Sequence, residues 1–215
     1  MRRIYAVGED EVTKAIIRKV LSVFAPDLEL FEELPARGSQ VKNLINNFNK
    51  LAASDPVILL TDLDEVDCAP MAKYRLLNGQ EQQEDFIINI AVDEAEAWLV
   101  ADSANFADYF GIDLQDMPGF VMQRQGGNKE CMEISLPIKT SYYLTHTLIL
   151  KSGKRELREQ IASHGKRSKG KEYNIAIVPF VERNWDIRNA MANSDSLRRM
   201  IKRVEALNLK YKVSG

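Results

Sequence analysis

Hydrophobic positions in the first half of the chain follow two alternating spacings. Short apolar runs that are typical of strands occur at residues 2–7, 28–34, 57–60 and 85–92. Helical spacing of apolar residues occurs between and after them, at residues 10–24, 39–54, 70–79 and 93–110, with Ser39 as a candidate cap and a break near Asp102. Strand and helix alternate four times, which predicts an α/β fold with a parallel sheet flanked by helices.

The second half of the chain has a weaker pattern. Residues 131–136 and 141–150 fit either strands or helix pieces, whereas residues 194–207 have the spacing of an amphipathic helix. Its predicted inward positions are Leu197, Ile201, Val204 and Leu207, and its mostly outward positions are Arg198, Arg199, Lys202 and Arg203. We expect an acidic α/β core over residues 1–115 and a basic α+β extension over residues 116–215, packed on that core.

Two acids follow the most apolar predicted strand. Asp62 and Asp64 come directly after residues 57–60, with Leu63 between them. Side chains two apart in an extended chain point the same way, so the two carboxylates would repel each other. A divalent cation removes that cost, and Mg²⁺ prefers carboxylate oxygen. The alternative is that these acids are solvated loop residues or cap the next helix.

Acids also follow two other predicted strands. Glu9 and Asp10 follow the first, and Asp93, Glu94 and Glu96 follow the fourth. Parallel strands bring these ends to one edge of the sheet, which predicts a cation site there. Positions i and i+2 on a helix lie about 200° apart, so one of Glu94 and Glu96 should face that site and the other solvent. The alternative is that each acid only stabilises the first turn of a helix.

Charge divides unevenly along the 215 residues. The net charge of −2 combines −12 over residues 1–120 with +10 over residues 121–215. The basic part is densest between residues 151 and 171, which predicts contact with the backbone of DNA or RNA. The candidate nucleic-acid-binding residues are Lys151, Lys154, Arg155, Arg158, Lys166, Arg167, Lys169 and Lys171. The alternative is that the acidic and basic halves attract each other.

The cysteine and histidine content and the hydropathy of the chain limit its expected location and chemistry. Cys68 and Cys131 form no disulfide framework, and no apolar run reaches the roughly 20 residues of a membrane span. The first ten residues lack the apolar segment of a secretory signal. We therefore expect a cytoplasmic protein without membrane contact. With only two histidines and no G-x-S-x-G motif, carboxylates are the expected agents of any chemistry.

The order of strand, Glu9, helix and a later strand ending in Asp62-Leu63-Asp64 resembles the TOPRIM fold of primases, topoisomerases and OLD-type nucleases. Longer segments, above all "VILLTDLDEVDCAP" and "IAVDEAEAWLVAD", resemble a poorly characterised bacterial family of TOPRIM-like proteins. The resemblance covers most of the chain. Some members of that family are encoded beside ATPases in phage-defence loci, which implies a defence role and an ATPase partner.

The resemblance also implies roles for individual residues. Glu9 would act as general acid or base, and Asp62 and Asp64 would hold Mg²⁺ or Mn²⁺. Glu96, together with Glu94, matches further acids of the family site, which makes Glu9, Asp62, Asp64, Glu94 and Glu96 the candidate metal ligands. Lys129 matches a lysine found in related chains. One departure is the order Gly8-Glu9, where TOPRIM proteins often have the glutamate first.

Two functions are consistent with these residues. The first is a metal-dependent phosphoryl-transfer enzyme, a TOPRIM-type nuclease acting on DNA or RNA, in which Glu9, Asp62, Asp64, Glu96 and Lys129 would be catalytic. The second is a non-catalytic TOPRIM-like subunit that docks an ATPase. A phosphatase of the haloacid-dehalogenase type is disfavoured, because its D-x-D motif normally ends the first strand. The sequence leaves open whether the chain forms oligomers.

Overall fold

The computed structural model describes residues 1–36, 38–63, 68–125, 129–134, 136, 138–163, 169 and 172–213, with only the backbone described at residues 39, 121–125 and 129–131. The chain forms two compact units. The first comprises Met1–Ala91 with Arg198–Gly215, and the second comprises Val92–Leu197. Among the described helices, none combines the length and the apolar character needed to cross a membrane.

The first unit contains a parallel sheet of four strands, as the sequence predicts. The strands are β1 (Arg2–Gly8), β2 (Leu28–Glu33), β3 (Val57–Asp62) and β4 (Phe86–Ala91), in the order β2-β1-β3-β4. β3 is buried along its apolar residues and β4 along its whole length, because helices cover both faces of the sheet. All three strand pairings are parallel, so the carboxyl ends of β1, β3 and β4 meet at one edge.

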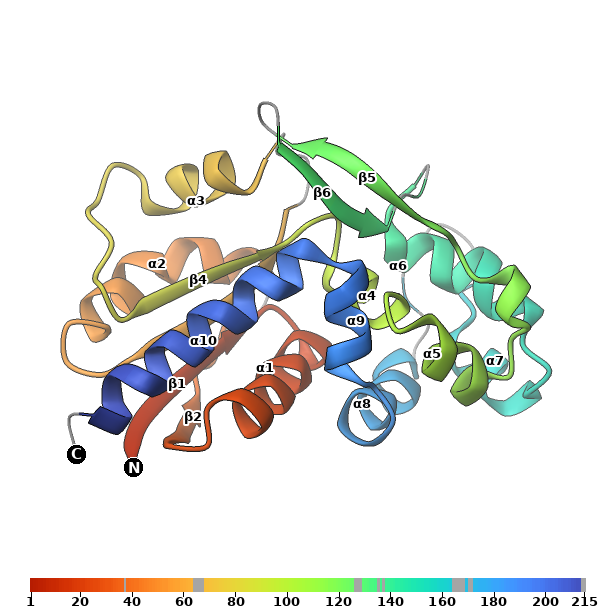
Figure 1. Cartoon of the computed structure of the whole chain (residues 1–215), viewed down its shortest axis with the longest axis horizontal. Coiled ribbons are helices and arrows are strands. Elements are labelled where there is room, and N and C mark those ends of the chain that lie inside the picture. Colours follow the sequence, from red (N-terminus) through yellow and green to blue (C-terminus); the bar gives the residue numbers. More distant parts are fainter. Residues whose placement is uncertain are drawn as a thin grey trace. The chain divides into compact units, whose positions relative to one another are not determined.

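The described residues of the first unit also form four helices. They are α1 (Glu11–Phe24), α2 (Ser39–Leu51), α3 (Ala69–Leu77) and α10 (Asp195–Val213), of which α10 enters the unit at residue 198. Right-handed crossovers put α1 on one face of the sheet and α2 and α3 on the other. α10 lies on the α1 side of the sheet and runs along the direction of β4 and β1 (Figure 1).

The last helix confirms the predicted burial of its apolar positions. Leu197, Ile201 and Val204 are completely buried, as their spacing predicts. Arg203 is exposed, as its position predicts, and it also donates a hydrogen bond to Asn89 of β4. One correction concerns Ser39, which is the first residue of α2 and not its cap; Gly38, with a φ of 48°, occupies the cap position.

The second unit has a hairpin and a set of short helices. The antiparallel strands are β5 (Phe120–Gln125) and β6 (Lys129–Ile134). The α-helices are α4 (Ala95–Val100), α5 (Ser103–Phe110), α6 (Thr140–Tyr143), α7 (Arg155–Ile161), α8 (Tyr173–Arg183) and α9 (Ile187–Asn193). Single turns of other helix types are η1 (Leu114–Asp116), η2 (Leu144–Leu148) and η3 (Ile149–Lys151). The predicted break between α4 and α5 is present at Ala101–Asp102.

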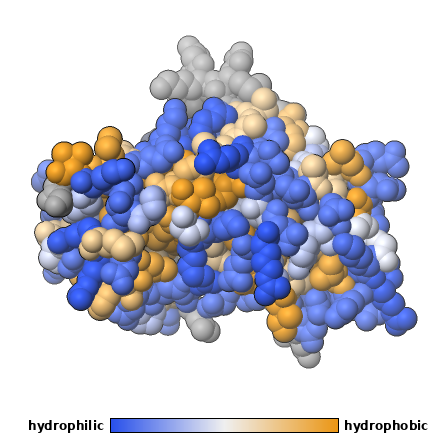
Figure 2. Space-filling model, turned by 60° about the horizontal axis from the view of Figure 1, so that its bottom comes forward, coloured by the Kyte–Doolittle hydropathy of each residue, from blue (hydrophilic) through white to orange (hydrophobic). Residues whose placement is uncertain are grey.

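Aromatic side chains form the core of this second unit. The ring centroid of Phe106 lies 4.4 Å from that of Phe110 and 5.3 Å from that of Phe180. Trp98 and Trp185 are also buried, and the Trp185 indole donates a hydrogen bond to the Trp98 carbonyl. Each unit therefore has a hydrophobic core of its own. On the face drawn in Figure 2 most of the surface is hydrophilic, with hydrophobic residues in separate patches.

Candidate functional site at the carboxyl ends of the strands

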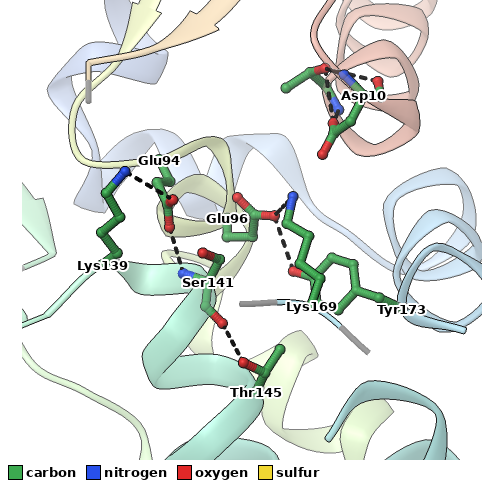
Figure 3. Close-up of polar contacts among 9 residues, drawn as sticks. Asp10, Glu94, Glu96, Lys139, Ser141, Thr145, Lys169 and Tyr173 are labelled. Atoms are coloured by element: carbon green, nitrogen blue, oxygen red, sulfur yellow. Dashed lines mark hydrogen bonds and ion pairs between the residues drawn. The ribbon is translucent and has the colours of Figure 1, made fainter. Parts of the chain in front are cut away.

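The turn from β1 into α1 holds Glu9 in a fixed backbone. Asp10 is the helix cap, and its carboxylate accepts a hydrogen bond from the Thr13 amide at 2.9 Å (Figure 3). A Cβ atom at Gly8 would lie 2.7 Å from the Thr13 hydroxyl and 2.9 Å from the Lys14 amide nitrogen. Only glycine therefore fits before Glu9, which explains why this chain reads Gly8-Glu9.

Glu9 reaches the neighbouring strand of the sheet. Gly8 pairs with Leu60, and the hydroxyl of buried Thr61 donates a hydrogen bond to the Glu9 carboxylate. The helices that follow β1 and β3 lie on opposite faces, so the two strands meet at a topological switch point, where α/β proteins bind ligands. Glu9 is half-buried there. The sequence predicted the position of Glu9 but not its Thr61 partner.

A cavity of about 420 Å³ opens beside the end of β3. Its lining residues are Lys42, Asn46, Thr61, Asp62, Leu63, Ala72, Arg75, Leu76 and Asn78. Asp62 is half-exposed, and the cations come from α2 and α3. Arg75 has no ion-pair partner among the described residues. The cavity thus combines a carboxylate with basic and amide groups, which the sequence pattern did not identify.

The other predicted site residues are placed differently. Asp64 lies outside the described residues, and Lys129 begins β6 with only its backbone described. Glu94 and Glu96 belong to the second unit. Within the described ranges, no group of three or more His, Cys, Asp or Glu side chains could hold a metal ion. The metal site therefore stays a prediction that depends on Asp64.

Asp93 and Glu94 anchor the start of α6. The Ser141 amide donates to the Glu94 carboxylate at 2.7 Å, and the Lys139 ammonium lies 4.0 Å from it (Figure 3). The amide and the hydroxyl of Thr140 both donate to Asp93, which has a φ of 66°. Burial raises the pKa of Asp93, and the hydrogen bonds from Thr140 act in the opposite direction.

Glu96 makes a separate set of contacts inside the second unit. Its carboxylate accepts the Lys169 ammonium at 2.8 Å and the Tyr173 hydroxyl at 3.1 Å (Figure 3). Glu96 is 2% exposed and Glu94 is 8% exposed, so the expectation that one of them faces solvent is wrong. Glu94 is the extended cap residue before α4, and the spacing rule for residues within a helix does not apply to it.

The described cations of the basic segment have partners within the chain. Lys151 pairs with Asp116 at 2.7 Å, and Arg155 pairs with Glu159 at 2.7 Å. Lys154 donates to the last carbonyls of α5, and Arg158 donates to the Ser152 carbonyl. Lys166, Arg167 and Lys171 lie outside the described residues. These contacts stabilise the second unit and leave nucleic-acid binding by the segment a prediction.

The parallel sheet and its switch point place the first unit in the class of α/β proteins with a candidate ligand site at the carboxyl ends of the strands. The family described as domain of unknown function (DUF4276) matches residues 7–129, more than half of the chain, so the chain belongs to this family. Comparison with curated proteins and with solved structures found no match.

Proposed function

We propose that the chain is a metal-dependent phosphoryl-transfer enzyme, a TOPRIM-type nuclease that acts on DNA or RNA. One observation carries the proposal. The acids Glu9 and Asp62 lie at the carboxyl ends of the adjacent strands β1 and β3; Asp62 lines a cavity together with basic residues, and Glu9 bonds Thr61, which also lines it. This is the edge where α/β folds bind ligands. The resemblance of the same residues to TOPRIM proteins supports the assignment.

The donor set suits a hard divalent cation. Asp62 offers carboxylate oxygen to the cavity, and Asp64 would add a second carboxylate from the same side of the chain. Glu9 would be the third carboxylate. When bound, Mg²⁺ or Mn²⁺ would supply electrostatic stabilisation of the charge that develops on a phosphodiester.

The side chains of the chain itself have separate tasks in this proposal. Thr61 holds the Glu9 carboxylate in place, and Glu9 takes or returns a proton of the attacking water or the leaving oxygen. Arg75 contacts the phosphate of the substrate from α3. Lys42 adds positive charge to the same cavity from α2. Orientation of the phosphate by these cations would make hydrolysis in the cavity faster than in water.

Incubation with nucleic acid and metal tests this proposal. We expect the chain to cleave DNA or RNA with Mg²⁺ or Mn²⁺ and not with EDTA. Metal at 100 times its dissociation constant should also stabilise the folded state by about 2.7 kcal/mol, visible as a higher melting temperature. Gel assays with single- and double-stranded substrates and a melting curve measure both. Absence of cleavage together with a metal-independent melting temperature would contradict the proposal.

Binding of nucleic acid should depend steeply on salt. Each phosphate contact contributes about −0.9 to the slope of log affinity against log salt for duplex DNA. Reversal of Lys166 and Arg167 to glutamate should therefore make the slope less steep by about two, whatever the sequence bound. Lys169 is left intact because it pairs with buried Glu96.

Fluorescence anisotropy at several salt concentrations gives this slope. The matched control reverses Lys50 and Lys202, two exposed lysines outside the basic segment. Equal slopes for the two double variants would argue against binding by the segment.

The contacts of the three acids that follow β4 favour a second function. Asp93, Glu94 and Glu96 bind amides, hydroxyls and two lysines within the second unit, as structural residues do. This function is that of a non-catalytic TOPRIM-like subunit that docks an ATPase, as the gene neighbourhood of related chains implies. Such a subunit would need these acids only for folding. In either case the proposed setting is anti-phage defence.

A further inference from the structure

A second cavity, of about 450 Å³, lies along the free edge of β4. β4 is the last strand of the sheet, and consecutive residues Ile87 and Ile88 both line the cavity. Consecutive residues of a strand point to opposite faces. Lys73 of α3 and Arg203 of α10, from the helices that cover these two faces, also line it. The cavity is therefore a groove that runs past the open edge of the sheet, and we name it the β4 groove.

A buried amide holds Arg203 in this groove. Asn89 is completely buried in the middle of a strand whose other residues are apolar. Its amide nitrogen donates to the Leu59 carbonyl at 3.3 Å, and its oxygen accepts from the Arg203 guanidinium at 2.7 Å. A polar residue at such a position is costly unless its hydrogen bonds are made. Asn89 therefore fixes the orientation of the guanidinium, whose remaining donors are left for another group.

Among the described residues, the β4 groove has two cations without an acidic partner. Lys210 pairs with Asp85 at 2.7 Å and with Glu84 at 3.2 Å, so the acids that line the groove are already engaged. Within the described part of the chain, neither Lys73 nor Arg203 forms an ion pair.

The pKa values of Lys73 and Arg203 are both lowered by burial and by neighbouring positive charge. Burial lowers the pKa of Lys73, and repulsion from Arg203 lowers it further. Burial and the charge of Arg199 lower the pKa of Arg203. An anion between the two cations would relieve their repulsion.

We propose that the β4 groove binds the phosphate group of a small molecule between Lys73 and Arg203. A guanidinium fork and an ammonium are the side chains that recognise phosphate oxygens most strongly. The groove contacts Phe86, Ile87 and Ile88, the half of β4 away from its carboxyl end. The phosphate site is therefore separate from the cavity that Asp62 lines, and it does not depend on the proposed nuclease activity.

Isothermal titration of the full chain with inorganic phosphate, pyrophosphate and AMP, in the absence of divalent metal, tests this site. We expect one site per chain in the wild type. Lys73→Ala and Arg203→Ala should each weaken binding roughly 10- to 100-fold, because each removes one charge-assisted contact. Lys202→Ala is the matched control, since it removes the same charge from the next position of α10 outside the groove.

The outcomes separate the sources of the phosphate. Tighter binding of AMP than of inorganic phosphate would support a nucleotide, and the reverse would support a free phosphate or pyrophosphate. Lack of binding by all three probes would overturn the proposal, as would wild-type affinity in Lys73→Ala. Equal losses in Lys73→Ala and Lys202→Ala would also overturn it, since they would indicate unspecific charge attraction. If Arg203→Ala does not fold, Arg203→Lys replaces it and is expected to weaken binding by loss of the fork.

Discussion

Replacement of both Asp62 and Asp64 by asparagine is expected to abolish metal-dependent cleavage. The change keeps the size of both side chains but removes the charge that would hold a divalent cation beside the cavity at the end of β3. Charge stabilisation by a metal contributes several kcal/mol, so cleavage should fall by about a thousandfold or more. The fold should survive, and without metal the melting temperature should be at least that of the wild type, because a repulsion is relieved.

The measurement compares cleavage and melting curves with and without Mg²⁺ or Mn²⁺. Asp108→Asn with Asp113→Asn is the control, since it neutralises two exposed acids in the second unit. The control should keep both the cleavage and the metal-dependent rise in melting temperature. Cleavage that persists in the Asp62 and Asp64 variant would show that these acids do not hold the catalytic metal. Loss of cleavage in the control variant, with cleavage kept in the Asp62 and Asp64 variant, would likewise contradict the proposed site.

The second large effect is expected on stability. Lys169→Met leaves the carboxylate of Glu96, which is 2% exposed, without its cationic partner. Removal of one member of a buried ion pair typically costs about 3–5 kcal/mol, and the Tyr173 hydroxyl would offset only part of that loss. We expect the lower end of this range, because the Lys169 side chain is 31% exposed.

A double-mutant cycle measures the coupling. Glu96→Gln combined with Lys169→Met should be less destabilised than the sum of the two single changes, because no unpaired charge remains. Arg155→Met, which breaks an exposed pair with Glu159, is the control and should have little effect. Additive single changes would refute a structural role for the pair. An increase in metal affinity on loss of Lys169 would instead favour Glu96 as a metal ligand.

The sequence predicted the first unit better than the second. The apolar runs of β3 and β4 and the periodicity of α1 and α2 depend on local spacing, and the parallel sheet follows from their alternation. The second unit consists of short helices, and the residues that hold it together are far apart in the chain. Ser141 lies 47 positions from Glu94, and Tyr173 lies 77 positions from Glu96.

The candidate site was predictable only where it depends on local features of the sequence. Strand ends and the spacing of Asp62 and Asp64 are local features, so Glu9 and Asp62 could be named from the sequence. Lys42 and Arg75 enter the cavity from two different helices, which no motif links to the strand. The structural use of Glu94 and Glu96 was missed because an acid at the start of a helix has the same pattern whether it binds a cation or a distant amide.

The course of α10 has a consequence for the order in which the chain folds. Residues 198–213 complete the first unit, where Arg203 bonds Asn89 and Asn208 bonds Asp27, yet they are synthesised after all of Val92–Leu197. On the ribosome the sheet is therefore made first but is covered last. The second unit is continuous in the chain and can fold during synthesis. One face of the sheet, by contrast, is fully covered only after α10 has been synthesised. Emergence of α10, rather than emergence of β4, is then the moment at which the first unit becomes complete.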